Sequence, residues 1–460
     1  MQTRWFKHLA GLLLFPALLF SASVPAEVFE KTLHNGLKVV VKEDHRAPVV
    51  VQQVWYHVGA MDELTGTTGI AHMLEHMMFK GTKTVPPGEF SRRIAAAGGR
   101  ENAFTDDDYT AYFQQLQASR LPLAMKLESD RMHNLKLSEA EFSKEVRVVM
   151  EERRMRTDDN PHALLYEKLM AAAYQEHPYR RPVIGWMDDL QEFTVGDVKN
   201  WYQEWYAPND ATLVVAGDVK ADDVFKLAQR YYGHIPARKL PVRKTHKEPP
   251  QVGIKRIVVK APAELPYLVM AWHAPQLLDA EKDWKPYALE VLAGVLDGNA
   301  SARLNKSLVR EQQLASDVDA GYDAVSRGPG MFVMEGTPSM GKTVADLEAG
   351  LRAQIALLEK DGVNEDELKR VKAQVTAAEV YKLDSVFYQA MQIGQLESVG
   401  LGYQAIPVML KKLQEVTAQQ VLDVAHEFLQ DDNLSVATLD PQPISGQRKH
   451  GFQGGNHELR

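Results

Sequence analysis

The sequence predicts an α+β protein with two similar domains, each a mostly antiparallel sheet with helices packed on it. Short apolar runs rich in valine alternate with longer segments of helical period along the chain. A similar order of segments occurs in residues 36–216 and again in residues 253–438, which indicates a degenerate internal duplication. A chain of 460 residues also favours more than one domain, because single hydrophobic cores rarely grow beyond about 250–300 residues.

The first domain is expected to span residues 27–236. It begins with two predicted strands at 36–41 and 49–58, and helical segments follow them. A buried strand at 211–217 and a helix at 221–231 close the domain.

A linker is predicted at residues 237–250, where prolines occur together with lysines and arginines. That composition is typical of a solvated linker, but an ordered surface loop fits it equally well. The second domain is expected at 251–445 and the polar, glycine-rich residues 446–460 as a flexible tail. The second domain repeats the pattern of the first, with strands at 254–259, 267–272 and 433–439 and a helix at 285–296.

The first 26 residues differ in composition from the rest of the chain. Arg4 and Lys7 precede an apolar run at 9–20, and small residues follow up to Ala26, which is the pattern of a secretory signal peptide. The run is shorter than the ~20 residues that cross a bilayer. We therefore expect a signal peptide at 1–26, a periplasmic or secreted protein, and no stable membrane span after cleavage. A retained membrane anchor is the alternative.

Two features of the composition exclude whole classes of function. The chain has no cysteine, which removes disulfide scaffolds, iron–sulfur centres and thiol nucleophiles. Its formal net charge is −8, so it lacks the basic surface that binds a nucleic-acid backbone. No nucleic-acid partner is expected.

A metal-binding motif stands at His72-Met73-Leu74-Glu75-His76. Residues around it have helical period, and Thr67 or Thr68 is expected to cap this helix. On a helix, side chains four residues apart lie on one face, so both imidazoles can bind one ion. Glu75 lies between them and is placed to contact water at the ion, as in the H-x-x-E-H motif of inverted zincins. Surface histidines on an amphipathic helix are the alternative.

A third metal ligand must come from histidine, aspartate or glutamate, and a second helix offers candidates at 138–154. Ser138 is a suitable helix cap. Glu145 and Glu152 are seven residues apart, about two helical turns, and therefore share a face. The spacing alone fits a solvated, charged helix equally well.

In combination, these residues resemble the pitrilysin/insulinase-type (M16) metallopeptidase family. Glu152 follows His76 after 75 intervening residues. Three other segments also resemble this family, namely its Asn-Ala-Phe-Thr edge strand at 102–105, its first strand at 35–40 and the end of its first domain at 214–218. The resemblance covers nearly the whole chain after the signal peptide.

The resemblance implies a zinc endopeptidase with one zinc ion per chain. His72, His76 and Glu152 would bind the ion, Glu75 would be the general base, and Glu145 would orient a ligand or the water. The implied protein is a half-size bacterial member, similar to the subunits of mitochondrial processing peptidase. Its two domains would face each other across a cavity.

The resemblance also implies a place for peptide substrates. They would lie extended along the strand that contains Asn102, Ala103 and Phe104, held by backbone hydrogen bonds as an added strand. Taken without the family, these three residues fit ordinary strand structure better.

The second domain departs from the family pattern in one respect. Arg310 matches an arginine that clamps substrate in similar peptidases, but Ser316 or Asp317 occupies the position of the accompanying tyrosine. Tyr322 is farther along the chain. We therefore expect that activity requires a related partner subunit, in a homodimer or a heterodimer.

Two functions other than peptide hydrolysis are compatible with parts of the sequence. Residues Gly336–Thr343 match the phosphate-binding pattern G-x-x-x-x-G-K-[ST]. We judge nucleotide binding unfavourable, because two helices follow in place of the parallel strand that a nucleotide fold requires. The other alternative is a non-proteolytic structural or assembly subunit with the same fold, but such a protein tends to lose one of the metal-site residues.

Overall fold

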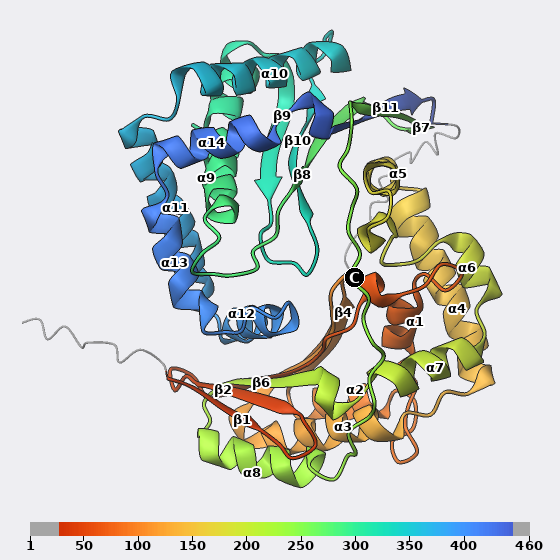
Figure 1. The fold of residues 1–460 in the computed structure, drawn as a ribbon. Helices are drawn as coiled ribbons and strands as arrows, with labels where there is room; N and C mark the ends of the chain where they lie inside the picture. Colours follow the sequence, from red (N-terminus) through yellow and green to blue (C-terminus); the bar gives the residue numbers. More distant parts are fainter. Residues whose placement is uncertain (1–26, 445–460) are drawn as a thin grey trace, which may run out of the picture.

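A computed structural model describes residues 27–444 (Figure 1). The predicted signal peptide and flexible tail lie outside the described residues. The α+β prediction is confirmed: two sheets form, each with helices on both faces. Within the described part of the chain, no helix is both long enough and apolar enough to cross a membrane.

The first sheet has six strands, and every neighbouring pair is antiparallel except β2 and β6. The central strands are almost entirely buried because valine and other apolar residues point to both faces. From one edge to the other, the strands are β1 (Val28–Thr32), β2 (Lys38–Glu43), β6 (Ala211–Gly217), β3 (Val49–Tyr56), β5 (Thr110–Gln117) and β4 (Arg100–Thr105).

The second sheet repeats the order of the first without β1, which is what an internal duplication predicts. Its first pair, β7 with β11, is parallel like β2 with β6, and the other pairs are antiparallel. The strands in spatial order are β7 (Lys255–Pro262), β11 (Leu434–Gln442), β8 (Tyr267–Ala274), β10 (Gly330–Pro338) and β9 (Ala315–Tyr322).

One face of each sheet packs on helices of its own half, and the two cores between them hold most of the buried apolar side chains. In the first half these helices are α1 (Ile70–Met77), α2 (Glu89–Ala96), α3 (Leu121–Asn134), α4 (Glu139–Arg153), α6 (Met187–Glu192), α7 (Val195–Trp205) and α8 (Ala221–Tyr232). In the second half they are α9 (Lys285–Asp297), α10 (Val344–Asp361), α11 (Glu365–Lys382), α13 (Ala405–Glu415) and α14 (Ala418–Phe428).

The other face of each sheet is covered by a helix from the opposite half (Figure 1). Helix α5 (Pro161–Ala173), from the first half, packs on β11 and β7 of the second sheet. Helix α12 (Val386–Ser398), from the second half, packs on β6 and β3 of the first sheet. The sequence did not predict this reciprocal exchange, which makes the two cores depend on each other.

An ion pair between the buried Asp44 and the exposed Arg46 helps to fix α12 on the first sheet. The Asp44 carboxylate accepts hydrogen bonds from Arg46 at 2.6–3.1 Å and from Gln389 of α12 at 3.0 Å. Arg46 also donates to the backbone oxygens of Leu383 and Asp384, next to α12. The hydrogen bonds from the Arg46 guanidinium lower the pKa of Asp44 from 3.8 to about 2.

This pair predicts a specific loss of stability in acid. The folded-state pKa of Asp44 lies below its unfolded value, so its contribution is complete above about pH 4 and is lost as the pH falls through about 2. Asp44→Asn should therefore lower the midpoint of urea unfolding at neutral pH and flatten its decline between about pH 4 and pH 2. Asp384→Asn is the control: its exposed carboxylate lies 3.5 Å from the same Arg46 but is not buried, so the variant should keep most of the wild-type decline. An unchanged acid profile in Asp44→Asn would contradict this account.

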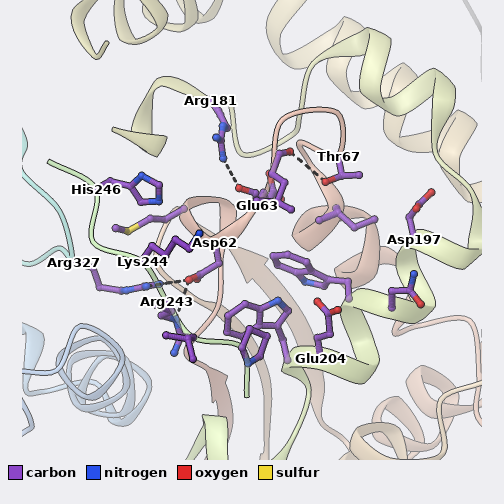
Figure 2. Close-up of a pocket in the computed structure, with 18 residues that line it drawn as sticks. Asp62, Glu63, Thr67, Arg181, Asp197, Glu204, Arg243, Lys244, His246 and Arg327 are labelled. Atoms are coloured by element: carbon purple, nitrogen blue, oxygen red, sulfur yellow. Dashed lines mark hydrogen bonds and ion pairs between the residues drawn. The ribbon is translucent and has the colours of Figure 1, made fainter. Parts of the chain in front are cut away.

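The segment between the two halves has no helix or strand at 237–250, but it is held against the first half. Arg243 bonds to the Asp62 carboxylate at 2.9 Å and to Asp210, while its guanidinium lies 4.6 Å from the ring of Trp205. Arg327 of the second half binds the same Asp62 at 2.7 Å (Figure 2). The segment is thus mostly exposed but makes specific contacts, and the bounds of the linker remain a prediction.

The nucleotide-binding pattern adopts a structure that has no phosphate cradle. Gly336 and Thr337 are extended residues of β10, which pairs antiparallel with both β8 and β9. Thr343 caps α10 by bonding to Asp346. Because a phosphate loop needs a turn after a strand of a parallel sheet, the structure offers no support for nucleotide binding here.

Candidate metal centre and peptidase site

Helix α1 presents the H-x-x-E-H motif, and its N-terminus is fixed by a residue that the sequence did not indicate. The helix starts after Gly69, which has a φ of 88°, and the Glu63 carboxylate accepts hydrogen bonds from the N–H groups of Gly69 and Ala71. The prediction of a cap at Thr67 or Thr68 is wrong, because the Thr68 hydroxyl bonds to Asp189 instead. Burial raises the pKa of Glu63 to about 8, while the two backbone hydrogen bonds lower it. These bonds satisfy N–H groups that have no partner within the first turn of the helix.

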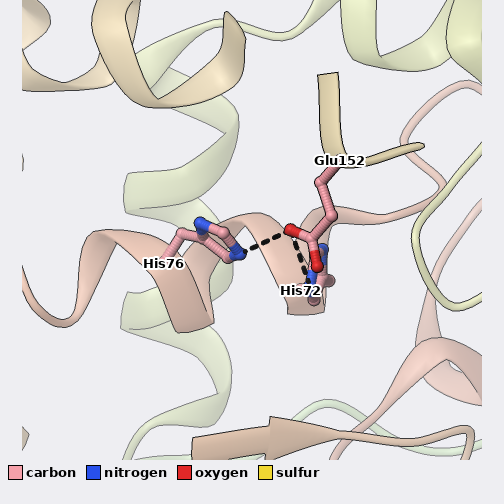
Figure 3. Close-up of side chains that lie close together, drawn as sticks. All are labelled: His72, His76 and Glu152. Carbon is pink, nitrogen blue, oxygen red and sulfur yellow. Dashed lines mark ion pairs between the residues drawn. The ribbon is translucent and has the colours of Figure 1, made fainter. Parts of the chain in front are cut away.

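The structure brings His72, His76 and Glu152 together, although Glu152 comes from α4 (Figure 3). One ligand atom from each lies within 4.8 Å of the other two. Nε2 of His76 is 3.1 Å from Oε2 of Glu152, and Nε2 of His72 is 3.9 Å from the same oxygen. Two ligands bound tetrahedrally to one zinc ion at about 2.0–2.1 Å lie about 3.4 Å apart. Two imidazoles and one carboxylate at these distances fit a zinc site with an open position.

Glu145 contacts the ring nitrogen of His76 that faces away from Glu152. Its Oε1 lies 3.0 Å from Nδ1 of His76, and its Oε2 lies 2.6 Å from Nζ of Lys80. A carboxylate on the second ring nitrogen fixes the imidazole and leaves Nε2 as the ligand atom, as in many zinc sites. His76 thus contacts Glu145 and Glu152, two helical turns apart, through its two ring nitrogens.

Burial and charge give the two histidines opposite pKa shifts. Burial, and then the charges of His76 and Arg156, lower the pKa of His72 to about 3, so its imidazole is neutral. Burial also opposes the charge on His76, but the hydrogen bond to Glu145 and the neighbouring carboxylates raise its pKa above 6.5. The carboxylates that favour a proton on His76 also favour a divalent cation, and a neutral imidazole is the form that binds one.

Glu75 lies on the same helix, beside the three candidate ligands. Its Oε2 accepts a hydrogen bond of 2.5 Å from the Thr105 hydroxyl. Burial raises the pKa of Glu75, while the Thr105 hydrogen bond acts in the opposite direction. This carboxyl group therefore lies close to the three candidate ligands but is not part of the cluster that they form.

A cavity of about 980 Å³ opens beside these side chains. Asn102, Ala103 and Phe104 of the edge strand β4 line it, together with the candidate metal ligands and one side of α4. The Phe104 ring packs on Trp55, with ring centroids 5.4 Å apart. In the described part of the chain, the residues that line this cavity all come from the first half.

The structure does not bring Arg310 to this cavity. Arg310 is exposed near the end of a π-helix at Asn305–Glu311, and it forms no ion pair with the described residues. Ser316 bonds to its neighbour Asp317 and to the oxygen of Thr337. The Tyr322 hydroxyl bonds to the backbone oxygen of Pro275. The Tyr322 hydroxyl therefore already has a hydrogen-bond partner. Substrate contact by Arg310 remains a prediction.

Sequence reasoning missed three side chains that hold the site in place. Arg156 binds Oε1 of Glu152 at 2.7 Å, Lys80 binds Glu145, and Thr105 binds Glu75. Arg156 follows Glu152 by four residues, and this i,i+4 spacing could have indicated the pair. The positions of Lys80 and Thr105 depend on contacts between separate elements, which no local spacing reveals.

Comparisons with known proteins match both halves of the chain. Residues 38–186 match the model for insulinase (peptidase family M16), and residues 192–375 match the model for the peptidase M16 inactive domain. The zinc protease PqqE of Helicobacter pylori is 32% identical over 95% of this chain and 99% of its own. The chain belongs to the M16 peptidase family.

Other relatives and solved structures are also similar to this chain. The uncharacterised zinc protease YmxG of Bacillus subtilis is 26% identical over 89% of this chain and 97% of its own. The crystal structure of a Helicobacter pylori protease has a TM-score of 0.85 and 30% identity, and it covers 90% of this chain and 100% of its own. An M16-like peptidase from Alicyclobacillus acidocaldarius shares the fold, with a TM-score of 0.82, 22% identity, and coverage of 92% of this chain and 100% of its own.

Proposed function

We propose that this chain is an exported, zinc-dependent endopeptidase that hydrolyses peptides or unfolded segments in the periplasm or outside the cell. The observation that carries the proposal is the convergence of His72, His76 and Glu152 in a cavity beside an open strand edge. Membership in a family whose relatives are named zinc proteases supports the same activity. The sequence pattern of residues 1–26 supports export.

Each residue of the proposed site has a distinct part in hydrolysis. His72, His76 and Glu152 would hold one zinc ion, and Glu145 would orient His76. When bound, the ion supplies Lewis acidity, which activates water near neutral pH and polarises the peptide carbonyl. Glu75 would accept the proton of the attacking water and deliver it to the leaving amine.

The substrate would bind as an added strand on β4. This strand is at the edge of the sheet, so its outer N–H and C=O groups are available for pairing. Asn102, Ala103 and Phe104 lie along that strand and line the cavity. Pairing with β4 would hold a peptide in an extended conformation past the metal site. Because the pairing uses backbone groups, it would depend little on the side chains of the peptide.

A related second subunit, in a homodimer or a heterodimer, would complete the substrate clamp. This part of the proposal is supported by the position of Arg310 outside the cavity and by the missing tyrosine at Ser316 or Asp317. The alternative of a non-proteolytic assembly subunit has less support, because all four residues of the H-x-x-E-H…E pattern are present and adjacent.

Metal removal and one ligand substitution test the proposal. Chelation should abolish peptide hydrolysis, and added zinc should restore it. Glu152→Gln should lower the zinc content, because the variant replaces a charged ligand by a weak neutral one. Glu151→Gln, on the same helix but exposed and bonded to Arg154, should keep its zinc.

The result that counts against the proposal is hydrolysis that survives both chelation and Glu152→Gln. Rapid turnover by the purified chain as a monomer, with its mass checked under assay conditions, would reject the requirement for a partner and leave the peptidase assignment intact.

A further inference from the structure

One oxygen of the Glu75 carboxylate is held by the protein and the other is not. Thr105 Oγ1 donates to Oε2 at 2.5 Å, and among the described residues no other group hydrogen-bonds to this carboxylate. Glu75 also lines the cavity. A carboxylate anchored through one oxygen keeps the lone pairs of the other free to accept a proton.

The hydroxyl that holds Glu75 is itself fixed. Thr105 is the last residue of β4 and pairs with Thr110 of β5 in the antiparallel ladder. Strand β4 also contacts α1, the helix that carries Glu75. Because threonine is β-branched, its χ1 angle has few alternatives in a strand. The donor therefore has a defined position relative to α1.

The same strand carries the residues proposed to bind substrate. Asn102, Ala103 and Phe104 immediately precede Thr105, and β4 has a neighbouring strand on one side only. A peptide that adds to the open edge would be aligned by the backbone of β4. The register of the peptide and the orientation of Glu75 would then be set by one six-residue strand.

We propose that Thr105 is a positioning residue whose hydroxyl holds Glu75 in the orientation that activates water above a peptide paired with β4. This inference rests on the proposed function, in which Glu75 is the general base. Hydrogen bonds to ionised groups are among the stronger ones in proteins, and small errors in the placement of a catalytic group are costly.

Two substitutions separate the hydroxyl from the shape of the side chain. Thr105→Val keeps the β-branched shape and removes the donor, whereas Thr105→Ser keeps the donor. We expect Thr105→Val to lower kcat about tenfold or more, with KM, zinc content and melting temperature close to wild type. Thr105→Ser should retain most of the wild-type kcat. In a Glu75→Gln background, Thr105→Val should cause no further loss.

Several outcomes would overturn the inference. Wild-type kcat in Thr105→Val would do so, as would a Thr105→Ser variant as slow as Thr105→Val. A lower zinc content or a lower melting temperature in Thr105→Val would mean that the hydroxyl stabilises the site or the fold and does not position Glu75. Glu75→Gln distinguishes failure of the proposed function from failure of this inference. If Glu75→Gln is as fast as wild type, Glu75 is not the base. If Glu75→Gln is slow and Thr105→Val is fast, only the role of Thr105 is wrong.

Discussion

Glu75→Gln is expected to give a folded, zinc-loaded protein that hydrolyses peptides at least about a hundredfold more slowly than wild type. The substitution keeps the size of the side chain, and the amide oxygen can still accept the hydrogen bond from Thr105. It removes the carboxylate that would take the proton from water. Because Glu75 is not among the three clustered ligand residues, zinc content should not change.

The measurement is steady-state hydrolysis of a fluorogenic peptide, together with metal analysis of the same samples. Glu139→Gln is the control, because Glu139 lies on α4, is exposed and accepts a hydrogen bond from Ser143, and neither residue lines the cavity. Equal turnover in Glu75→Gln and wild type would reject Glu75 as the base. Loss of zinc from Glu75→Gln would instead show that this residue contributes to metal binding.

Gly394→Ala is expected to destabilise the whole protein, although alanine is the better helix former. Gly394 lies within α12, and a Cβ there would be 2.0 Å from two atoms of the Trp55 ring. Trp55 is fully buried, donates to Gln53 at 2.9 Å and packs edge-on against Tyr109, so its ring has no room to move. Overpacking at such a site costs on the order of 2 kcal/mol, more than the about 1 kcal/mol that alanine adds to a helix.

The test is the free energy of unfolding from urea denaturation. Gly394→Ala should lower it clearly, while the control Gly321→Ala should change it little, because no heavy atom lies within 4 Å of a Cβ at that position. A Gly394→Ala protein as stable as wild type, or more stable, would mean that α12 does not pack on the first sheet as described. The two halves could then be independent of each other.

Local patterns predicted many elements well. The closing strand of the first half was expected at 211–217 and is β6 (Ala211–Gly217), because a short run rich in β-branched residues favours a buried strand over a helix. The expected helix at 285–296 is α9 (Lys285–Asp297), because its apolar residues recur with helical period. The predicted cap of α1 was wrong, because the side chain of Glu63, six residues before Gly69, binds its N–H groups in place of a threonine hydroxyl.

The sequence by itself determined that the chain forms two α+β halves and that His72, Glu75 and His76 share one helical face, because strand and helix periods are local properties. Only the tertiary structure decided which distant groups meet: Glu152 at both histidines, Thr105 at Glu75, and α5 and α12 on each other's sheets. An apolar stripe indicates that a helix is buried, but it does not indicate which surface the helix packs on. That choice depends on the shape of the completed cores.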